Sequence, residues 1–253
     1  MVLVADVGNT NAVVGISEQD QWIAHWRIST NYKRTVDEYT VTLHQLISMQ
    51  NIDPTGVKTI VLSSVVPNLT GVFQDVLQRL FDAPILLVTN TIETGLVASS
   101  IPAELGGDLL ANAAAAHHLV KKPVMVIDFG TALTFITVSA DGVLLGASIA
   151  PGLNSAIKAL STGTAQLPQV DLHEPPSVLG VNTETAIQSG VLYGYAGLVQ
   201  SIIERTEAEI GEKLFVIATG GLSRIALPVI KRIDHADPWH TLIGLRLFAS
   251  LNT

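Results

Sequence analysis

The chain has 253 residues, 14 Lys and Arg against 22 Asp and Glu, a formal net charge of −8 and no cysteine. Its length exceeds the roughly 150 residues of a typical domain, so we expect two domains or lobes, each able to bury a core of its own. The absence of cysteine excludes disulfides, thiolate metal sites and a cysteine nucleophile. The acidic balance argues against nucleic acid as the main partner, because that binding rests on clustered Lys and Arg.

The apolar stretches are too short to predict a membrane span. The window 142–157, for example, is broken by Gly146, Pro151 and Gly152, and no window reaches the roughly 20 apolar residues that a membrane helix needs. The N-terminal segment has no basic residue before Asp6, unlike a secretion signal. We therefore expect a cytoplasmic protein that has no membrane partner.

In the first half of the chain, short β-branched runs alternate with stretches of helical period. Strands are predicted over 2–7, 12–17, 58–66 and 85–88, and helices over 35–49 and 72–81. The first helix begins with the capping-box pattern of Thr35 and Glu38. Pro67 is expected to end the strand that precedes it.

The second half repeats this alternation. Helices are predicted over 108–119, 187–203, 222–230 and 241–251, and strands over 124–127, 135–138, 143–149 and 214–218. Gly190, Gly194 and Gly197 lie near one face of the long helix, where glycine costs helix stability, so we expect them to permit close approach of another helix or subunit. The pattern predicts an α/β protein, with lobes at residues 1–115 and 116–253.

One motif occurs twice, once in each half. Asp6-Val7-Gly8-Asn9-Thr10 and Asp128-Phe129-Gly130-Thr131-Ala132 each end a buried strand with an acid and continue into a glycine turn, at an offset of 122 residues. A carboxylate at a strand end can hold a cation, glycine lets the backbone approach a phosphate, and hydroxyls and amides donate to phosphate oxygens. Two such turns could bind a nucleoside triphosphate. The alternative is that each is only a polar hairpin turn.

Two further glycine motifs adjoin predicted helices. Thr219-Gly220-Gly221 follows a strand and could let a base or ribose lie against the backbone, although alone it is ordinary loop chemistry. With two phosphate turns before it, it is typical of actin-like, sugar-kinase-like ATP-binding proteins; no P-loop pattern is present. Asp108 follows Gly106-Gly107 at a helix start, where the helix dipole favours its ionised form, so it is either a helix cap or a general base.

These motifs, in this order and spacing, resemble the type III pantothenate kinases across nearly the whole chain. The matching stretches are residues 6–10, 34–39, 63–67, 106–108, 128–132, 149–152, 167–168, 180–183, 188–190 and 218–221. The resemblance implies two actin-like, ribonuclease H-like lobes with ATP in the cleft between them. It also implies a homodimer through the helix near 187–203. The implied activity is ATP-dependent phosphorylation of the pantothenate hydroxyl, the first step of coenzyme A synthesis.

The resemblance also implies cofactors and residue roles. The cofactors are ATP, Mg²⁺ and a monovalent cation, K⁺ or NH₄⁺. The implied residues are the first phosphate loop of Asp6, Val7, Gly8, Asn9, Thr10, Asn11, Ala12 and Val13; Thr131 for the second phosphate contact; Gly220 and Gly221 for ATP; and Gly106, Gly107, Asp108, Leu109 and Thr183 for substrate. Asp6 would bind Mg²⁺ through water, Asp128 the monovalent cation, and Asp108 would be the general base. Thr183 would reach substrate across the dimer.

Several positions depart from the family pattern. Leu109 replaces an arginine, Ser99 a tyrosine, Leu133 a threonine and Ala147 a glycine. Leucine cannot replace the planar arginine fork that pairs with a carboxylate such as that of pantothenate. We therefore expect nucleotide binding to persist while pantothenate binding is weakened or the acceptor has changed. The alternatives are a nucleotide-binding regulatory or sensor protein and a kinase of another small hydroxyl compound.

Overall fold

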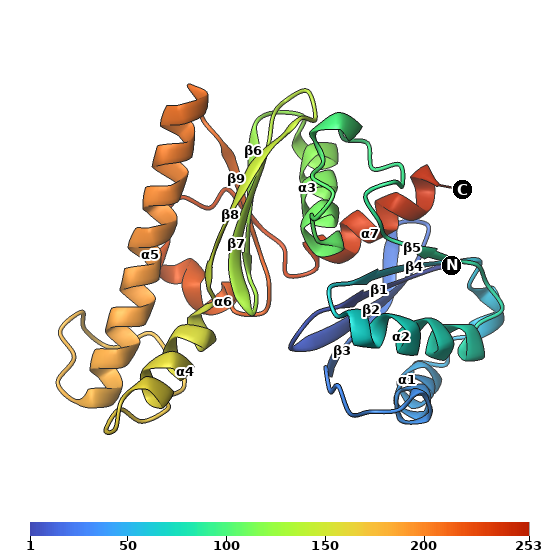
Figure 1. The fold of residues 1–253 in the computed structure, drawn as a ribbon, viewed down its shortest axis with the longest axis horizontal. Coiled ribbons are helices and arrows are strands. Elements are labelled where there is room, and N and C mark those ends of the chain that lie inside the picture. Colours follow the sequence, from blue (N-terminus) through green and yellow to red (C-terminus); the bar gives the residue numbers. More distant parts are fainter. Residues whose placement is uncertain (253) are drawn as a thin grey trace. The chain divides into compact units, whose positions relative to one another are not determined.

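The computed structural model describes residues 1–252, which form two compact α/β units (Figure 1). The first unit contains Met1–Ala115 together with the chain from Thr241 onward, and the second contains Ala116–His240. The expected second lobe, 116–253, was therefore wrong at its C-terminal end, because the last helix belongs to the first unit. Within the described residues, no helix combines the length and the apolar character that crossing a membrane requires.

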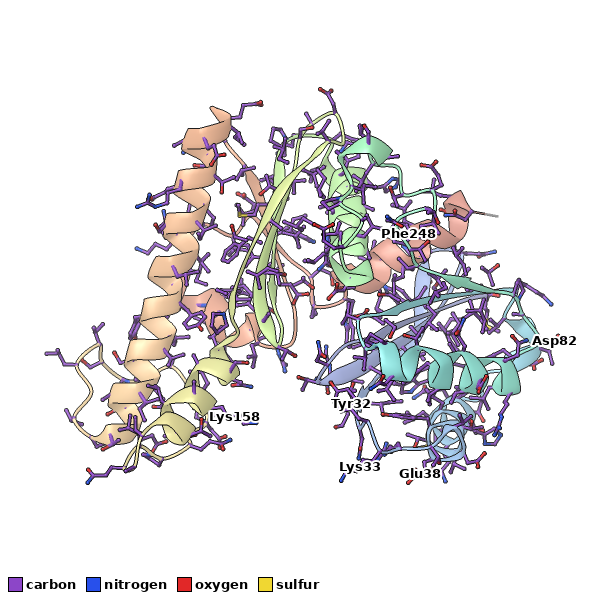
Figure 2. All side chains as sticks on the ribbon, in the orientation of Figure 1. Tyr32, Lys33, Glu38, Asp82, Lys158 and Phe248 are labelled. Atoms are coloured by element: carbon purple, nitrogen blue, oxygen red, sulfur yellow. The ribbon has the colours of Figure 1, made fainter. Side chains whose placement is uncertain are left out.

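The C-terminal helix α7 (His240–Leu251) belongs to the first unit because its apolar side chains are buried there. Leu245 and Phe248 are fully buried, and Figure 2 labels Phe248 on this helix. Gly244 of α7 lies so close to the backbone carbonyl of Ala111 that no side chain would fit between them. The hydroxyl of Thr241 donates a hydrogen bond to Oδ1 of Asn112 at 2.9 Å. Apolar periodicity predicts such a helix but does not say which core it covers.

The first unit is built on a five-stranded mixed sheet. Its strands are β1 (Val2–Val7), β2 (Asn11–Glu18), β3 (Gln21–Ser29), β4 (Thr59–Ser64) and β5 (Ile85–Leu87), in the order β3-β2-β1-β4-β5. Strands β1, β4 and β5 are parallel, whereas β2 and β3 are antiparallel additions. Helices α1 (Val36–Met49) and α2 (Pro67–Leu80) cover one face, where Leu3 and Leu62 share a core with Tyr39 and Phe73 (Figure 1).

Local sequence signals account for two helix starts in this unit. The predicted capping box of α1 is confirmed: Thr35 N–H donates to the Glu38 carboxylate at 2.8 Å, and Glu38 N–H donates to Thr35 Oγ1 at 3.3 Å. Pro67 follows strand β4 as predicted, and it is also the first residue of α2. Its fixed φ and missing N–H suit the first helical position, so α2 begins at Pro67 rather than at residue 72.

The second unit repeats the same sheet topology. Its strands are β6 (Val124–Phe129), β7 (Ala132–Val138), β8 (Leu144–Pro151), β9 (Phe215–Thr219) and β10 (His235–Ala236), in the order β10-β9-β6-β7-β8. The two ends of β6 lie 122 residues after those of β1. The duplication predicted from two short motifs therefore extends to the whole sheet.

Helices pack on one face of this second sheet. They are α4 (Leu153–Gly163), α5 (Thr183–Ile210) and the short α6 (Ser223–Ala226), and their apolar residues share a core with Ile127 and Phe129. The predicted helix over 222–230 is instead α6 followed by a 3-10 turn, η3 (Leu227–Val229), which contains Pro228. The remaining 3-10 turns are η1 (Pro54–Gly56) and η2 (Ala98–Ser100). Helix α3 (Gly107–Val120) follows the latter.

Candidate functional site

The Gly8 loop follows β1 at the carboxyl end of the parallel strands. Asp6 is paired in register with Ser63 of β4, whose hydroxyl donates to Asp6 Oδ1 at 2.9 Å. The loop is closed by Gly8 N–H, which donates to the Asn11 carbonyl at 3.0 Å. The Thr30 hydroxyl donates to the Gly8 carbonyl at 2.7 Å. These bonds hold both the acid and the loop backbone in place.

The tip of this loop is exposed. Asn9 and Thr10 are both exposed, and the carbonyl of Thr10 accepts from Thr30 N–H at 2.9 Å. The hydroxyl of Tyr32, which follows β3, donates to Asn9 Oδ1 at 3.2 Å (Figure 2). A fixed backbone with exposed polar residues at its tip is suited to bind an anion.

Asp108 lies in the first turn of α3, beside the same end of the sheet. A Cβ at Gly107 would lie 2.9 Å from Ser63 Oγ, so glycine permits the helix to approach the strand. A Cβ at Gly106 would lie only 2.6 Å from Asp108 Oδ1. Because glycine has no Cβ, it leaves room there for the carboxylate. The structure thus brings the predicted residues 6–13 and 106–109 together in the first unit. The reason is that Asp6 and Ser63 lie at the ends of adjacent parallel strands, and the start of α3 packs against Ser63.

The pKa of the Asp108 carboxyl is shifted in the direction opposite to the one expected from the helix dipole, because burial has the largest effect. Its Oδ1 accepts a hydrogen bond from Leu109 N–H at 2.8 Å, which favours the ionised form. Burial has the larger effect and raises the pKa of the Asp108 carboxyl above its ordinary value. The position at a helix start predicts a lowered pKa, because the helix dipole favours the carboxylate. The sequence does not reveal the burial that outweighs this effect.

Asp128 occupies the same place in the second unit as Asp6 does in the first. It lies at the end of β6 and is paired in register with Thr219 of β9. Gly220 has a φ of +91°, and a Cβ there would collide with Asp128 Oδ1. A Cβ at Gly130 would lie 3.3 Å from the same oxygen. The carboxylate is therefore held against the backbones of two glycines.

Ser63 and Thr219 are equivalent in the two sheets but differ in their hydrogen bonds. Ser63 donates to Asp6, whereas Thr219 Oγ1 has no hydrogen-bond partner among the described residues although Thr219 is only 1% exposed. A buried hydroxyl without a partner costs about 1–3 kcal/mol. Its lone pairs, on the strand next to Asp128, could instead contact a bound cation.

The described residues hold no group of three or more His, Cys, Asp and Glu side chains that could bind a metal. A cation at Asp128 would therefore bind to one carboxylate together with hydroxyl, carbonyl or water oxygens. Such a set of hard oxygen donors suits an alkali or alkaline-earth cation better than a soft metal ion.

Thr131 lies in the loop after β6 and contacts the start of α4. Its carbonyl accepts from Gly152 N–H at 3.2 Å and from the Ser155 hydroxyl at 2.9 Å. A Cβ at Gly152 would lie 2.5 Å from the Gly130 carbonyl oxygen, so only glycine fits there. The loop backbone is thus fixed while Thr131 itself is exposed.

The Gly220-Gly221 turn joins this group. Leu222 N–H donates to the Phe129 carbonyl at 3.2 Å, and the Ser223 hydroxyl donates to the Gly220 carbonyl at 2.8 Å. Asp128, Thr131, Gly220 and Gly221 therefore gather at the carboxyl end of β6 and β9.

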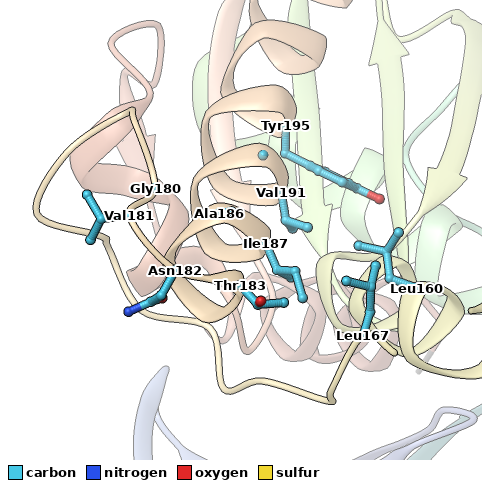
Figure 3. A pocket seen from close by; sticks show the side chains of 11 residues that line it. Leu160, Leu167, Gly180, Val181, Asn182, Thr183, Ala186, Ile187, Val191 and Tyr195 are labelled. Atoms are coloured by element: carbon cyan, nitrogen blue, oxygen red, sulfur yellow. The ribbon is translucent and has the colours of Figure 1, made fainter. Parts of the chain in front are cut away.

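Thr183 does not join either group. It is the first residue of α5, is exposed, and lines a largely apolar pocket of ≈ 720 Å³ with Leu160, Leu167, Ile187 and Tyr195 (Figure 3). None of the other predicted site residues lines this pocket.

Sequence reasoning missed several residues that contact the two loops. Ser63, Thr219 and Thr30 were not predicted as site residues. The available signal was a hydroxyl residue at the end of a buried run, as in Ser63-Ser64 and Thr219. That signal becomes specific only when the sheet register pairs the hydroxyl with an acid.

Solved structures with low sequence identity show the fold. The chain is similar to a Baf family protein from Campylobacter jejuni described as a transcriptional activator, at 18% identity and a TM-score of 0.61, over 98% of this chain and 97% of that one. It is similar to the MreB 5 protein of Spiroplasma citri, at 10% identity and a TM-score of 0.55, over 98% and 96%. It is also similar to an inorganic polyphosphate/ATP-glucomannokinase from Arthrobacter, at 15% identity and a TM-score of 0.53, over 100% and 99%. The fold is that of actin-like and sugar-kinase-like ATPases.

Sequence comparison shows the family. The family model described as type III pantothenate kinase matches residues 2–205. The type III pantothenate kinase of Roseiflexus sp. is 43% identical over 100% of this chain and 99% of its own length. That of Moorella thermoacetica is 41% identical over 100% of both chains. The chain with the two duplicated acid–glycine loops therefore belongs to the type III pantothenate kinase family.

Proposed function

We propose that this protein transfers the γ-phosphoryl group of ATP to the hydroxyl of pantothenate, giving 4'-phosphopantothenate in the first step of coenzyme A synthesis. The observation that carries the proposal is the placement of Asp108 beside Asp6 and the Gly8 loop, in a chain whose full-length relatives are type III pantothenate kinases. The second loop, at Asp128 and Thr131, supplies a further set of polar groups.

The two loops would bind ATP with backbone amides and hydroxyls rather than with basic side chains. In the first loop the residues are Asp6, Val7, Gly8, Asn9, Thr10, Asn11, Ala12 and Val13, and in the second unit they are Thr131, Gly220 and Gly221. Asp6, fixed by Ser63, would hold Mg²⁺ through water. The metal ion neutralises charge on the transferred phosphoryl group when bound.

Asp128 would bind the monovalent cation, K⁺ or NH₄⁺. Support comes from the carboxylate held between Gly130 and Gly220 and from the buried hydroxyl of Thr219 on the adjacent strand, which has no hydrogen-bond partner in the described part of the chain. A cation there would satisfy the Thr219 oxygen. Its charge would lie near the phosphate loop at Thr131.

Asp108 would act as the general base. Its carboxylate is anchored through Oδ1 by Leu109 N–H and is half-buried. Burial raises the pKa of this carboxyl, which makes the carboxylate a stronger base than that of an exposed aspartate. The pantothenate hydroxyl would lose its proton to Asp108 as the hydroxyl oxygen attacks the γ-phosphorus of ATP. The bond between that phosphorus and the β,γ-bridging oxygen would break, and ADP would leave. Gly106, Gly107 and Leu109 would line the substrate side.

A homodimer is the proposed assembly. A Cβ at Gly190, Gly194 or Gly197 of α5 would have no atom within 4 Å, and Ile149 on the edge strand β8 is 69% exposed. These surfaces would suit a second copy of the chain. Thr183 of one subunit would then contact the substrate bound in the site of the other subunit. We also propose that the protein acts in the cytoplasm without nucleic-acid or membrane partners, in keeping with its acidic balance.

Leu109 keeps a second candidate function open. It contributes a backbone N–H to Asp108 but has no side-chain donor for the pantothenate carboxylate. This favours weakened pantothenate binding, a different small hydroxyl acceptor, or a regulatory or sensor role in which ATP binds without transfer.

The deciding experiment measures ADP release with and without pantothenate, in the presence and absence of K⁺. We expect pantothenate-dependent release that Asp108→Asn abolishes while ATP binding is kept. The control is Asp75→Asn, because Asp75 is an exposed residue of α2. Release with another hydroxyl compound instead of pantothenate would favour a changed acceptor. ATP binding without transfer to any acceptor would favour the sensor role.

A further inference from the structure

One side chain of helix α5, Tyr195, reaches the backbone beside the second phosphate loop. The hydroxyl of Tyr195 donates to the backbone carbonyl of Pro151 at 2.7 Å. Pro151 ends β8, and the next residue, Gly152, donates its N–H to the Thr131 carbonyl at 3.2 Å. This hydrogen bond links the middle of α5 to the peptide that precedes the Gly152 contact with Thr131.

We propose that Tyr195 is a positioning residue that holds the Pro151-Gly152 backbone against the second phosphate loop and thereby sets the affinity for ATP phosphates. This inference rests on the proposed function, because it requires that Thr131 and its loop bind the nucleotide.

The contact between Gly152 and the loop leaves little tolerance for movement. A Cβ at Gly152 would lie 2.5 Å from the Gly130 carbonyl oxygen and 2.9 Å from the carbonyl carbon of Thr131. Because the two backbones are in close contact, a shift at Pro151 must be passed on to Gly130 and Thr131. Ser155 adds a second bond to the Thr131 carbonyl from the first turn of α4.

The Tyr195 hydroxyl is suited to act as a permanent donor. Its ring packs against the core of the second unit and lines the pocket beside α5, where it extends away from the helix (Figure 3). Burial raises the pKa of the Tyr195 hydroxyl above its ordinary value of 10.0, so the proton is present at any physiological pH. The bond to Pro151 is therefore not sensitive to pH in the working range.

Tyr195→Phe tests the proposal, because it removes the hydroxyl and keeps the ring. The matched control is Tyr193→Phe on the same helix; Tyr193 makes no hydrogen bond through its hydroxyl to the residues described. Calorimetry with the full-length protein would measure the Kd of ATP with Mg²⁺ and the Kd of adenosine, which has no phosphates. We expect Tyr195→Phe to raise the Kd of ATP about three- to ten-fold, as loss of one hydrogen bond implies, and to leave that of adenosine unchanged. Tyr193→Phe should change neither.

The outcomes separate this inference from the function on which it rests. An unchanged Kd of ATP in Tyr195→Phe overturns the positioning role. An equal rise in the Kd of ATP and of adenosine also overturns it, because it indicates that the whole nucleotide site is disturbed. If the unmodified protein binds ATP but phosphorylates no acceptor, the proposed function fails, and the two Kd values still decide the role of Tyr195. If the unmodified protein binds no ATP, both proposals are overturned.

Discussion

Gly220→Ala should lower the stability of the protein and weaken the proposed binding of K⁺ at Asp128. Gly220 has a φ of +91°, which L side chains rarely adopt. An added Cβ would collide with Asp128 Oδ1 and would lie 2.7 Å from both the N and the C atom of Phe129. Because Phe129 belongs to the central strand β6, the backbone cannot easily move away, and the Asp128 carboxylate must be displaced.

The size of the effect follows from two contributions. A left-handed conformation costs an alanine about 1–2 kcal/mol. Forcing an additional carbon into a packed site costs typically about 1–3 kcal/mol. Together they predict a loss of roughly 2–5 kcal/mol, which for a chain of this size lowers Tm by roughly 5–15 °C.

Thermal unfolding measures the change in Tm and its dependence on K⁺. It is carried out with and without KCl at about 0.1 M ionic strength, with NaCl as the control for ionic strength. The matched variant is Gly71→Ala in α2, where a Cβ meets no atom within 4 Å. It should stabilise the protein by about 0.5–1 kcal/mol, because alanine is the better helix former. If Gly220→Ala unfolds within a degree of the unmodified protein and keeps its K⁺ response, the close contact between Gly220 and Asp128 is refuted.

Three further predictions concern single side chains. Leu109→Arg should raise kcat/KM for pantothenate about tenfold or more by supplying a charged donor; an unchanged value in steady-state kinetics would show that position 109 does not face the acceptor. Thr219→Val should remove the rise in Tm expected from the proposed K⁺ site and should not lower Tm without K⁺, since the hydroxyl has no hydrogen-bond partner among the described residues; a preserved K⁺ effect argues against Thr219 as a ligand. Burial lowers the pKa of His117 below 6.5, so the unfolded chain binds this proton first as the pH falls. The free energy of unfolding measured in urea should therefore be independent of this group above about pH 6.5 and decrease below it. His117→Gln should make that decrease smaller, whereas His118→Gln, at an exposed position, should not.

The candidate site was predicted in its parts rather than in its arrangement. Asp6, Asp128 and the glycines after them were identified from the sequence, because each motif is continuous and occurs twice. The pairing of these acids with Ser63 and Thr219 was not, because it depends on the register between β1 and β4 and between β6 and β9. The raised pKa of Asp108 was also missed, since desolvation depends on neighbours that are distant in the chain.

Helices and strands with strong local sequence signals were predicted, and those without such signals were missed. Strands β1 and β6 and helix α1 were predicted because continuous apolar runs and a capping box are local signals. Strand β3 was missed because it mixes exposed and buried residues, as an edge strand does. Helix α4 was missed because Leu153 and Ile157 are its only buried residues.

The sequence by itself determined the duplication, the two acid–glycine loops and the scarcity of basic residues, because these are properties of consecutive residues. Only the tertiary structure decided that α7 completes the first unit, that Tyr195 reaches Pro151, and that the buried Thr219 hydroxyl beside Asp128 has no partner within residues 1–252. The physical reason is that burial, register and hydrogen-bond partners are set by residues that the chain brings together from far apart.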